Sequence, residues 1–174
     1  MDTGAGLGKP KRVVLVRALR GLGDMLCAVP ALRSLRAGLP EAHIALVGLP
    51  ESTWLLERYP GYLDELLEFP GFPGVPEVPW RPERLARFIE EFNGVFDLAV
   101  QMHGSGLHTN GFTMTLGARR SAGYYLPALW QPDPELFIPF PPHEHEIRRW
   151  TALMRHLGMP DRGEWLEFPL QERD

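Results

Sequence analysis

The chain has 174 residues, 44% of them hydrophobic and 10% aromatic, which is enough for one domain with a real core. Its formal net charge of −4 disfavours a general nucleic-acid binder, which needs a basic face. The single cysteine excludes an intrachain disulfide, and no apolar run approaches the roughly 20 residues that cross a bilayer. We therefore expect a cytoplasmic globular protein, with peripheral contact at the inner face of the membrane left open.

The predicted elements alternate between strand and helix. Short β-branched apolar runs indicate strands buried on both faces, and apolar residues at three- and four-residue steps indicate helices. After a flexible tail at 1–11, the predicted order is strand 12–17, helix 24–39, strand 43–48, helix 51–58, strand 63–69, helix 84–92, strand 96–102, helix 107–116, strand 119–124 and helix 144–157. Pro30 lies inside the first helix and is expected to bend it.

Two proline-rich segments, 69–83 and 125–142, are predicted to be loops, because recurring proline removes backbone donors. Strands that alternate with helices through tight turns indicate βαβ units and right-handed crossovers. Residues 12–174 are therefore interpreted as one Rossmann-like α/β domain with a doubly wound parallel sheet. Ligands of such sheets bind beyond the carboxyl ends of the strands, so the loops after the first, second and fourth predicted strands are the informative ones.

The turn after the first strand carries glycines and a carboxylate. Gly21 and Gly23 look like the start of a dinucleotide-binding fingerprint, but Leu26 stands where the third glycine belongs, so this signal is weak. Asp24 stands where a pyrophosphate would rest and would repel it, whereas the helix dipole and free N–H groups would hold Asp24 ionised. Two interpretations stay open for Asp24: a helix N-cap, and a general base at the mouth of the sheet.

A second polar cluster follows the strand at 96–102. Gln101, His103, Gly104 and Ser105 stand at the predicted carboxyl edge, where polar side chains and glycines suit hydrogen bonds to a sugar or phosphate. The order His-Gly-Ser-Gly lacks the spacing of a nucleophile elbow, so hydrolase chemistry is disfavoured.

Other polar residues have less specific interpretations. Arg17 and Arg20 flank the first turn and could bind an anionic ligand, pair with Asp24 or serve only as surface charge. His143 and His145 have H-x-H spacing at a helix start and do not share a face, so we predict no metal site there.

Together, residues 13–40 and the strand 43–48 resemble the N-terminal domain of glycosyltransferase family 9, the family of the ADP-heptose–lipopolysaccharide heptosyltransferases. The residues that carry this resemblance are Arg17, Gly23, Asp24, Leu26, Pro30, Ala31 and Leu32. Two weaker blocks, 96–106 and 116–124, also look like blocks of that family. The match runs from about Arg12 to the end of the chain.

The resemblance implies the N-terminal half of a GT-B architecture, which binds the acceptor, while a C-terminal half binds the nucleotide sugar. Asp24 then becomes the candidate base that deprotonates the acceptor hydroxyl, which attacks the anomeric carbon with inversion and expels the nucleoside diphosphate. The acceptor contacts expected beside it are Arg17, Arg20, Gly21, Gly23, Gln101, His103, Gly104 and Ser105. No metal and no cofactor are implied; the partners are a glycan or lipid-linked glycan acceptor and a nucleotide diphosphate sugar donor.

Two departures and two rival functions follow. Cys27 stands where the family commonly has His, and the chain is about half as long as family members, so the donor domain is expected to be missing and the isolated chain inactive. A nucleotide-dependent oxidoreductase would need the third glycine and an acidic residue after the strand 43–48, and neither is present. A non-catalytic binding module would expose an apolar partner surface and could dimerise through it.

Overall fold

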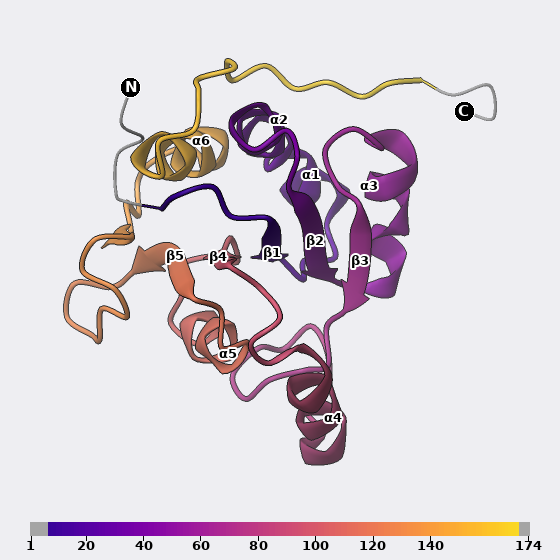
Figure 1. Cartoon of the computed structure of the whole chain (residues 1–174), viewed down its shortest axis with the longest axis vertical. Helices are drawn as coiled ribbons and strands as arrows, with labels where there is room; N and C mark the ends of the chain where they lie inside the picture. The colour runs from indigo at the N-terminus through magenta and orange to yellow at the C-terminus, as the bar shows by residue number, and fades with distance from the viewer. Residues whose placement is uncertain (1–6, 171–174) are drawn as a thin grey trace.

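The computed structural model describes residues 7–170, which form a parallel sheet between two layers of helices (Figure 1). The strands are β1 (Arg12–Val16), β2 (His43–Gly48), β3 (Glu65–Glu68), β4 (Leu98–Gln101), β5 (Arg120–Tyr125) and β6 (Phe137–Pro139). Their spatial order is β3-β2-β1-β4-β5-β6, and every neighbouring pair is parallel. The order reverses between β1 and β4, so the topological switch point lies beyond the carboxyl ends of these two strands.

The helices cover both faces of the sheet. They are α1 (Leu22–Leu26), α2 (Val29–Gly38), the short 3-10 helix η1 (Pro50–Ser52), α3 (Thr53–Arg58), α4 (Pro82–Phe92), α5 (Thr109–Thr115) and α6 (Glu146–His156). Figure 1 shows α1, α2 and α6 on one side of the sheet and α4 and α5 on the other. The predicted doubly wound, Rossmann-like class is confirmed.

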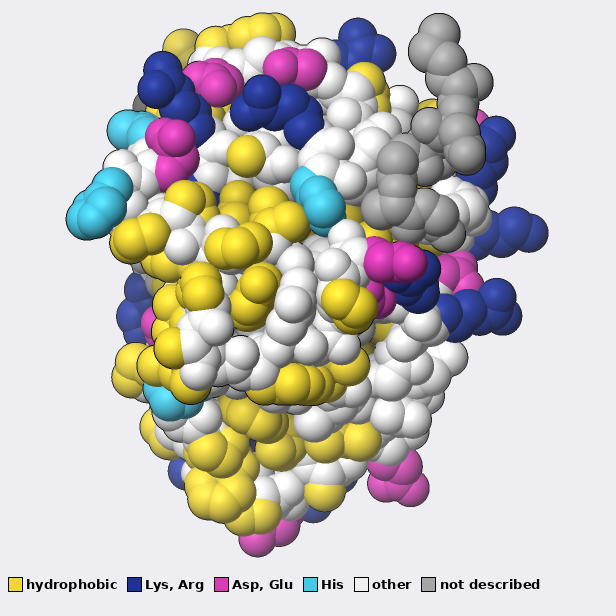
Figure 2. All heavy atoms as spheres, turned by 90° about the vertical axis from the view of Figure 1, so that its left-hand side faces the viewer, with side chains coloured by type: hydrophobic (Ala, Val, Ile, Leu, Met, Phe, Trp, Pro, Cys, Tyr) yellow, Lys and Arg dark blue, Asp and Glu magenta, His cyan; other side chains and the backbone are white. Residues whose placement is uncertain are grey.

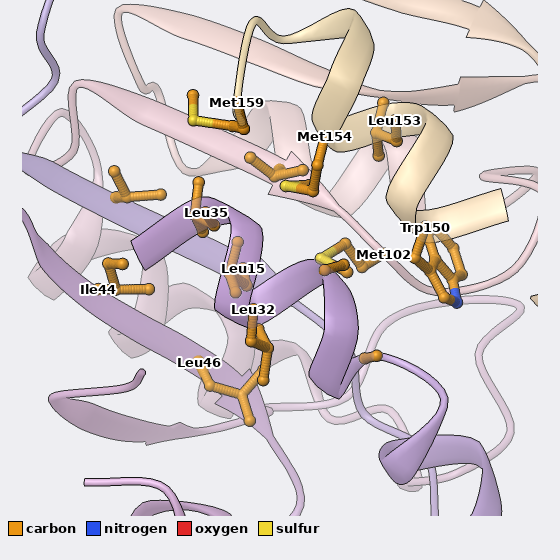
Figure 3. Close-up of a cluster of buried hydrophobic side chains, with 14 of the residues drawn as sticks. Leu15, Leu32, Leu35, Ile44, Leu46, Met102, Trp150, Leu153, Met154 and Met159 are labelled. Atoms are coloured by element: carbon orange, nitrogen blue, oxygen red, sulfur yellow. The ribbon is translucent and has the colours of Figure 1, made fainter. Parts of the chain in front are cut away.

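Alternate residues of β1 supply both cores. Val13 and Leu15 face the layer of α2, α3 and α6, while Val14 and Val16 face that of α4 and α5, and all four are fully buried. Trp150 of α6 belongs to the first core, and Figure 3 shows it near Met102, Leu153 and Met154. This packing brings α6, the last helix of the chain, against the carboxyl edge of β1 and β4.

The second core is built around an aromatic side chain of α5. The Phe112 ring centroid lies 5.1, 5.7 and 5.9 Å from those of Phe69, Phe72 and Phe88, and Phe112 is fully buried. Edge-to-face and tilted contacts of this kind add to the burial of apolar area. They attach α4 and the proline-rich loop that precedes it to the sheet.

Two expectations about local structure are wrong. The single helix with a bend at Pro30 is instead two helices, separated at Cys27 and Ala28, and Pro30 lies in the first turn of α2, where a missing N–H costs no hydrogen bond. The predicted loop at 125–142 contains β6, in which Phe137 pairs with Gly123 of β5.

Both ends of the described chain are attached to the domain. Residues 1–6 of the predicted flexible tail lie outside the described residues. At the other end of that tail, the Lys11 amide donates to the Asp97 carboxylate at 2.8 Å, and the Lys11 carbonyl accepts from the His43 amide. The C-terminal segment, residues 159–170, runs over the helices in Figure 1, where Arg33 of α2 donates to its carbonyls and, at 2.8 Å, to the Glu167 carboxylate. Within residues 7–170, no helix could span a membrane.

Candidate active site

The structure places Asp24 on the surface at the carboxyl edge of the sheet. α1 begins at Leu22 with Gly21 as its N-cap, so Asp24 lies inside the first turn and the N-cap interpretation is wrong. The side chain is exposed, and within residues 7–170 its carboxylate takes part in no ion pair or hydrogen bond. A carboxylate with free acceptor oxygens at the switch point of the sheet could accept a proton from a ligand.

Arg17 does not reach the surface. Only 2% of it is exposed, and its guanidinium donates to the Met102 carbonyl at 2.6 Å, to the main-chain carbonyl of Asp24 and to the Glu146 carboxylate at 2.7 Å. Burial lowers the pKa of Arg17, and the hydrogen bond and charge of Glu146 oppose that effect. Arg17 is therefore occupied by protein groups and has no surface free for an acceptor.

Arg20 is exposed and attaches the proline-rich loop to the site. Its guanidinium lies 3.3 Å from the Glu51 carboxylate and donates to the main-chain carbonyl of Glu77. Exposed ion pairs of this kind contribute little to stability, so Arg20 could exchange these partners for an anionic ligand.

His103 is held in one orientation by two loops. Its Nδ1 accepts from the Ala18 amide at 3.2 Å, and its Nε2 lies 3.4 Å from the Glu77 carboxylate. Because Nδ1 uses its lone pair on an N–H, the ring proton belongs on Nε2, facing Glu77. Burial lowers the pKa of His103, with the Glu77 charge opposing it. Because the Nδ1 lone pair is engaged by Ala18 and Nε2 carries the proton, the ring has no free lone pair to offer a substrate.

Gln101 lies beneath the same edge and is fully buried. Its side-chain amide donates to the main-chain carbonyl of His103 at 2.8 Å and to the Thr109 hydroxyl at 2.7 Å. Gln101 therefore shapes the loop after β4 from below and is not at the surface where an acceptor would bind.

The loop after β4 lines a hollow of about 230 Å³. Its lining includes His103, Gly104 and Ser105, which were predicted to form one polar cluster, together with residues of the proline-rich loop. A groove of about 430 Å³ continues from it toward the loop after β5, where Leu129 and Trp130 are 52% and 59% exposed. The face with β5 and this loop is turned to the viewer in Figure 2, and hydrophobic side chains gather across its middle.

The structure thus divides the predicted acceptor contacts. His103, Gly104 and Ser105 share one hollow, Arg20 is exposed beside the proline-rich loop, and Gly21 and Gly23 flank the exposed start of α1. The two buried residues, Arg17 and Gln101, hold these loops from inside.

Glu146 and Glu77 are the site residues that sequence reasoning missed. Glu146 stands at a polar predicted helix start, and Glu77 stands in the proline-rich loop 69–83, so only the fold brings them to Arg17 and His103. One sequence signal indicates that Arg17 is buried. It continues the face of β1 that carries Val13 and Leu15, so the period of two points its side chain inward.

Cys27 is not an activated thiol, and the paired histidines are not part of a metal site within residues 7–170. Burial raises the pKa of the half-buried Cys27 thiol, and the Glu146 charge adds to the effect, so the thiol stays protonated near neutral pH. His143 and His145 are exposed, and in the described part of the chain no three His, Cys, Asp or Glu side chains are grouped to hold a metal ion.

The strand order, the two helical layers and the polar carboxyl edge define a Rossmann-like α/β domain of the kind found in GT-B glycosyltransferases. No protein-family model and no curated protein matches the sequence.

Similarity to particular proteins is seen among solved structures. A glycosyl transferase family 9 protein from Veillonella parvula DSM 2008 superposes with a TM-score of 0.68 at 20% identity, over 99% of this chain and 48% of its own. The E. coli heptosyltransferase WaaC, solved with ADP, gives 0.58 at 16% identity, over 86% of this chain and 48% of its own. Its complex with ADP-2-deoxy-2-fluoro heptose gives 0.58 at 15% identity, over 86% and 49%.

The chain therefore spans about half the length of the structures that it matches. At these identities the similarity concerns the fold, and at that level the predicted resemblance to glycosyltransferase family 9 is confirmed.

Proposed function

We propose that this chain is the acceptor-binding half of an inverting glycosyltransferase, which transfers a heptose-like sugar from a nucleoside diphosphate sugar to a lipopolysaccharide or other glycan acceptor. The observation that carries the proposal is the Asp24 carboxylate, exposed at the switch point of the sheet and free of protein partners within residues 7–170. The shared fold with a family 9 glycosyltransferase and with a heptosyltransferase solved with nucleotide and nucleotide-sugar analogue supports it.

In the proposed reaction, Asp24 acts as general base. It removes the proton of an acceptor hydroxyl while the hydroxyl oxygen forms a bond to the anomeric carbon of the donor sugar. The bond from that carbon to the diphosphate oxygen breaks on the opposite face, and the electron pair leaves with the nucleoside diphosphate. The configuration at the anomeric carbon is therefore inverted, and Asp24 returns its proton to solvent.

Neighbouring groups are less suited to this role. His103 has its Nδ1 lone pair on the Ala18 amide and its Nε2 proton toward Glu77. Glu146 uses Oε1 to accept from both Arg17 and Trp150. Burial raises the pKa of Glu146, but the hydrogen bond and charge of Arg17 more than offset this and lower that pKa, so Glu146 is a weak base. Of these three residues, only Asp24 has a carboxylate without an ion pair or hydrogen bond within residues 7–170.

The acceptor is proposed to lie along the loop after β4. The hollow beside His103, Gly104 and Ser105 offers main-chain and hydroxyl groups for a sugar, and the exposed Trp130 ring in the adjoining groove offers an aromatic face. Arg20 would contact an anionic acceptor group. The nucleotide sugar would be held by the other half of such an enzyme, without a metal or cofactor.

The test needs both halves of the proposed enzyme, so the intact protein here means this chain together with its donor-binding half. It is assayed with ADP-heptose and a lipopolysaccharide core acceptor as wild type, Asp24→Asn and Asp161→Asn. We expect Asp24→Asn to lower kcat by about 10²- to 10⁴-fold with an unchanged melting temperature, and the exposed Asp161 to be dispensable. NMR of the product would show inversion. Near-normal turnover of Asp24→Asn would remove the base, and acceptor binding without transfer would favour a non-catalytic binding module.

A further inference from the structure

The main-chain carbonyl of Asp24 accepts a hydrogen bond from the side chain of Arg17, which follows β1. In a continuous helix its carbonyl would accept from the Ala28 amide, but that amide donates to Met25 instead, because α1 ends before α2 begins. The Arg17 guanidinium donates to the Asp24 carbonyl in its place. The residue proposed as the base thus has its backbone fixed by a buried cation.

The same guanidinium also holds the end of β4. Through Nη1 it donates to the Met102 carbonyl at 2.6 Å, one residue before His103, whereas Nη2 serves Asp24. A planar guanidinium can bind several acceptors at fixed angles, which a lysine ammonium on a flexible stem does not reproduce. Arg17 therefore sets the spacing between the two loops that carry the proposed site.

Arg17 in turn is held by α6. The Glu146 carboxylate accepts from Nη2 at 2.7 Å and from the Trp150 indole N–H at 3.1 Å, and the Trp150 ring centroid lies 5.0 Å from the Arg17 Cζ atom. Trp150 is fully buried, so its position is fixed by the core. A buried arginine without its carboxylate would be strongly disfavoured, which makes Glu146 necessary for this placement.

We infer that Arg17 and Glu146 are positioning residues, which hold the main chain of Asp24 in place and thereby aim its carboxylate at the acceptor hydroxyl. The inference rests on the proposed function for the identity of the reaction. Neither residue touches the reacting atoms: Glu146 acts through Arg17, and Arg17 acts through the Asp24 carbonyl.

The experiment compares Glu146→Gln and Arg17→Lys with Glu164→Gln in the intact protein. Glu164 is the matched control, because it pairs with Arg148 of the same helix at 3.1 Å but on the exposed side. Two quantities are measured: hydrogen exchange of the amides in residues 22–28, and kcat and KM for ADP-heptose well below the melting temperature. A contact with only a structural role would lower the melting temperature and leave kcat unchanged.

We expect Glu146→Gln to accelerate exchange in residues 22–28 about tenfold and to lower kcat about tenfold, with the KM for ADP-heptose unchanged. Arg17→Lys should have larger effects of the same kind, and Glu164→Gln should match wild type. The inference would be overturned if Glu146→Gln and Arg17→Lys both left hydrogen exchange in residues 22–28 unchanged. It would also be overturned if exchange became faster but kcat stayed the same, while Asp24→Asn was inactive. If Asp24→Asn stays active, the proposed function fails, and the exchange data still decide whether Arg17 holds Asp24.

Discussion

Gly21→Ala provides a sharp test of the candidate base, because it moves the Asp24 carboxylate without changing its chemistry. A Cβ atom on Gly21 would lie 2.3 Å from Asp24 Oδ2 and 3.1 Å from its Cγ. Gly21 has φ −72° and ψ 128°, angles that alanine adopts without strain. The backbone can therefore stay in place while the carboxylate has to move.

The size of this movement follows from ordinary atomic contacts. Separations of 3.4 Å or more are normal for a Cβ atom, so Oδ2 must retreat by about 1 Å. A misplacement of about 1 Å at a reacting group can cost about a hundredfold in rate. Alanine is a poorer N-cap than glycine but also restricts the unfolded chain, so the free energy of unfolding should change by less than about 1 kcal/mol.

The assay is kcat for transfer from ADP-heptose in the intact protein, with the melting temperature measured in parallel. Gly61→Ala is the matched control: it lies outside the site, and a Cβ atom there would meet nothing within 4 Å. We expect Gly21→Ala to lose about a hundredfold in kcat and Gly61→Ala to keep wild-type turnover. Equal activity of the two variants, both folded, would refute the assignment of Asp24 as the base.

Three further predictions concern the surroundings of the site. Phe112→Ala should lower the free energy of unfolding by about 3–5 kcal/mol in chemical denaturation, whereas Met114→Ala, on the exposed side of α5, should cost far less; similar losses would contradict the aromatic core. Burial lowers the pKa of His103 in the folded chain below its ordinary value of 6.5, so the unfolded chain binds the proton first as pH falls. The melting temperature of the wild type should therefore fall below about pH 6.5, and that of His103→Gln should depend less on pH. Arg33→Ala should speed proteolysis within the C-terminal segment, and Arg84→Ala, which removes an exposed ion pair with Glu68 outside that segment, should not.

The fold was largely predictable because most strands are marked by their own residues. A run such as Val13–Val16 is apolar at every position, which only a strand buried on both faces requires. The three residues of β6, Phe137–Pro139, lie among prolines and have no such signal; they are a strand because β5 offers them a free edge. The separation of α1 from α2 was missed for a similar reason, since apolar spacing continues across it.

The site was predictable only where the local chain determines it. Asp24 follows a glycine turn that ends a buried strand, so its place at the carboxyl edge follows from topology. Arg17 was predicted to bind an anionic ligand, to pair with Asp24 or to serve only as surface charge, whereas the structure buries it against Glu146 from the far end of the chain. The period of two along β1 indicates that Arg17 points inward, but sequence spacing does not identify its partner.

The contacts of Trp150 show why core and site cannot be separated here. The Trp150 ring packs from α6 into the core and is fully buried there. Its indole N–H donates to Glu146 Oε1, the same oxygen that accepts from Arg17. Any repacking that shifts α6 would therefore move Glu146, then Arg17, and finally the main chain of Asp24. A substitution far from the carboxyl edge could in this way alter turnover without touching a substrate, and its effect should disappear in a protein that already lacks the Arg17–Glu146 pair.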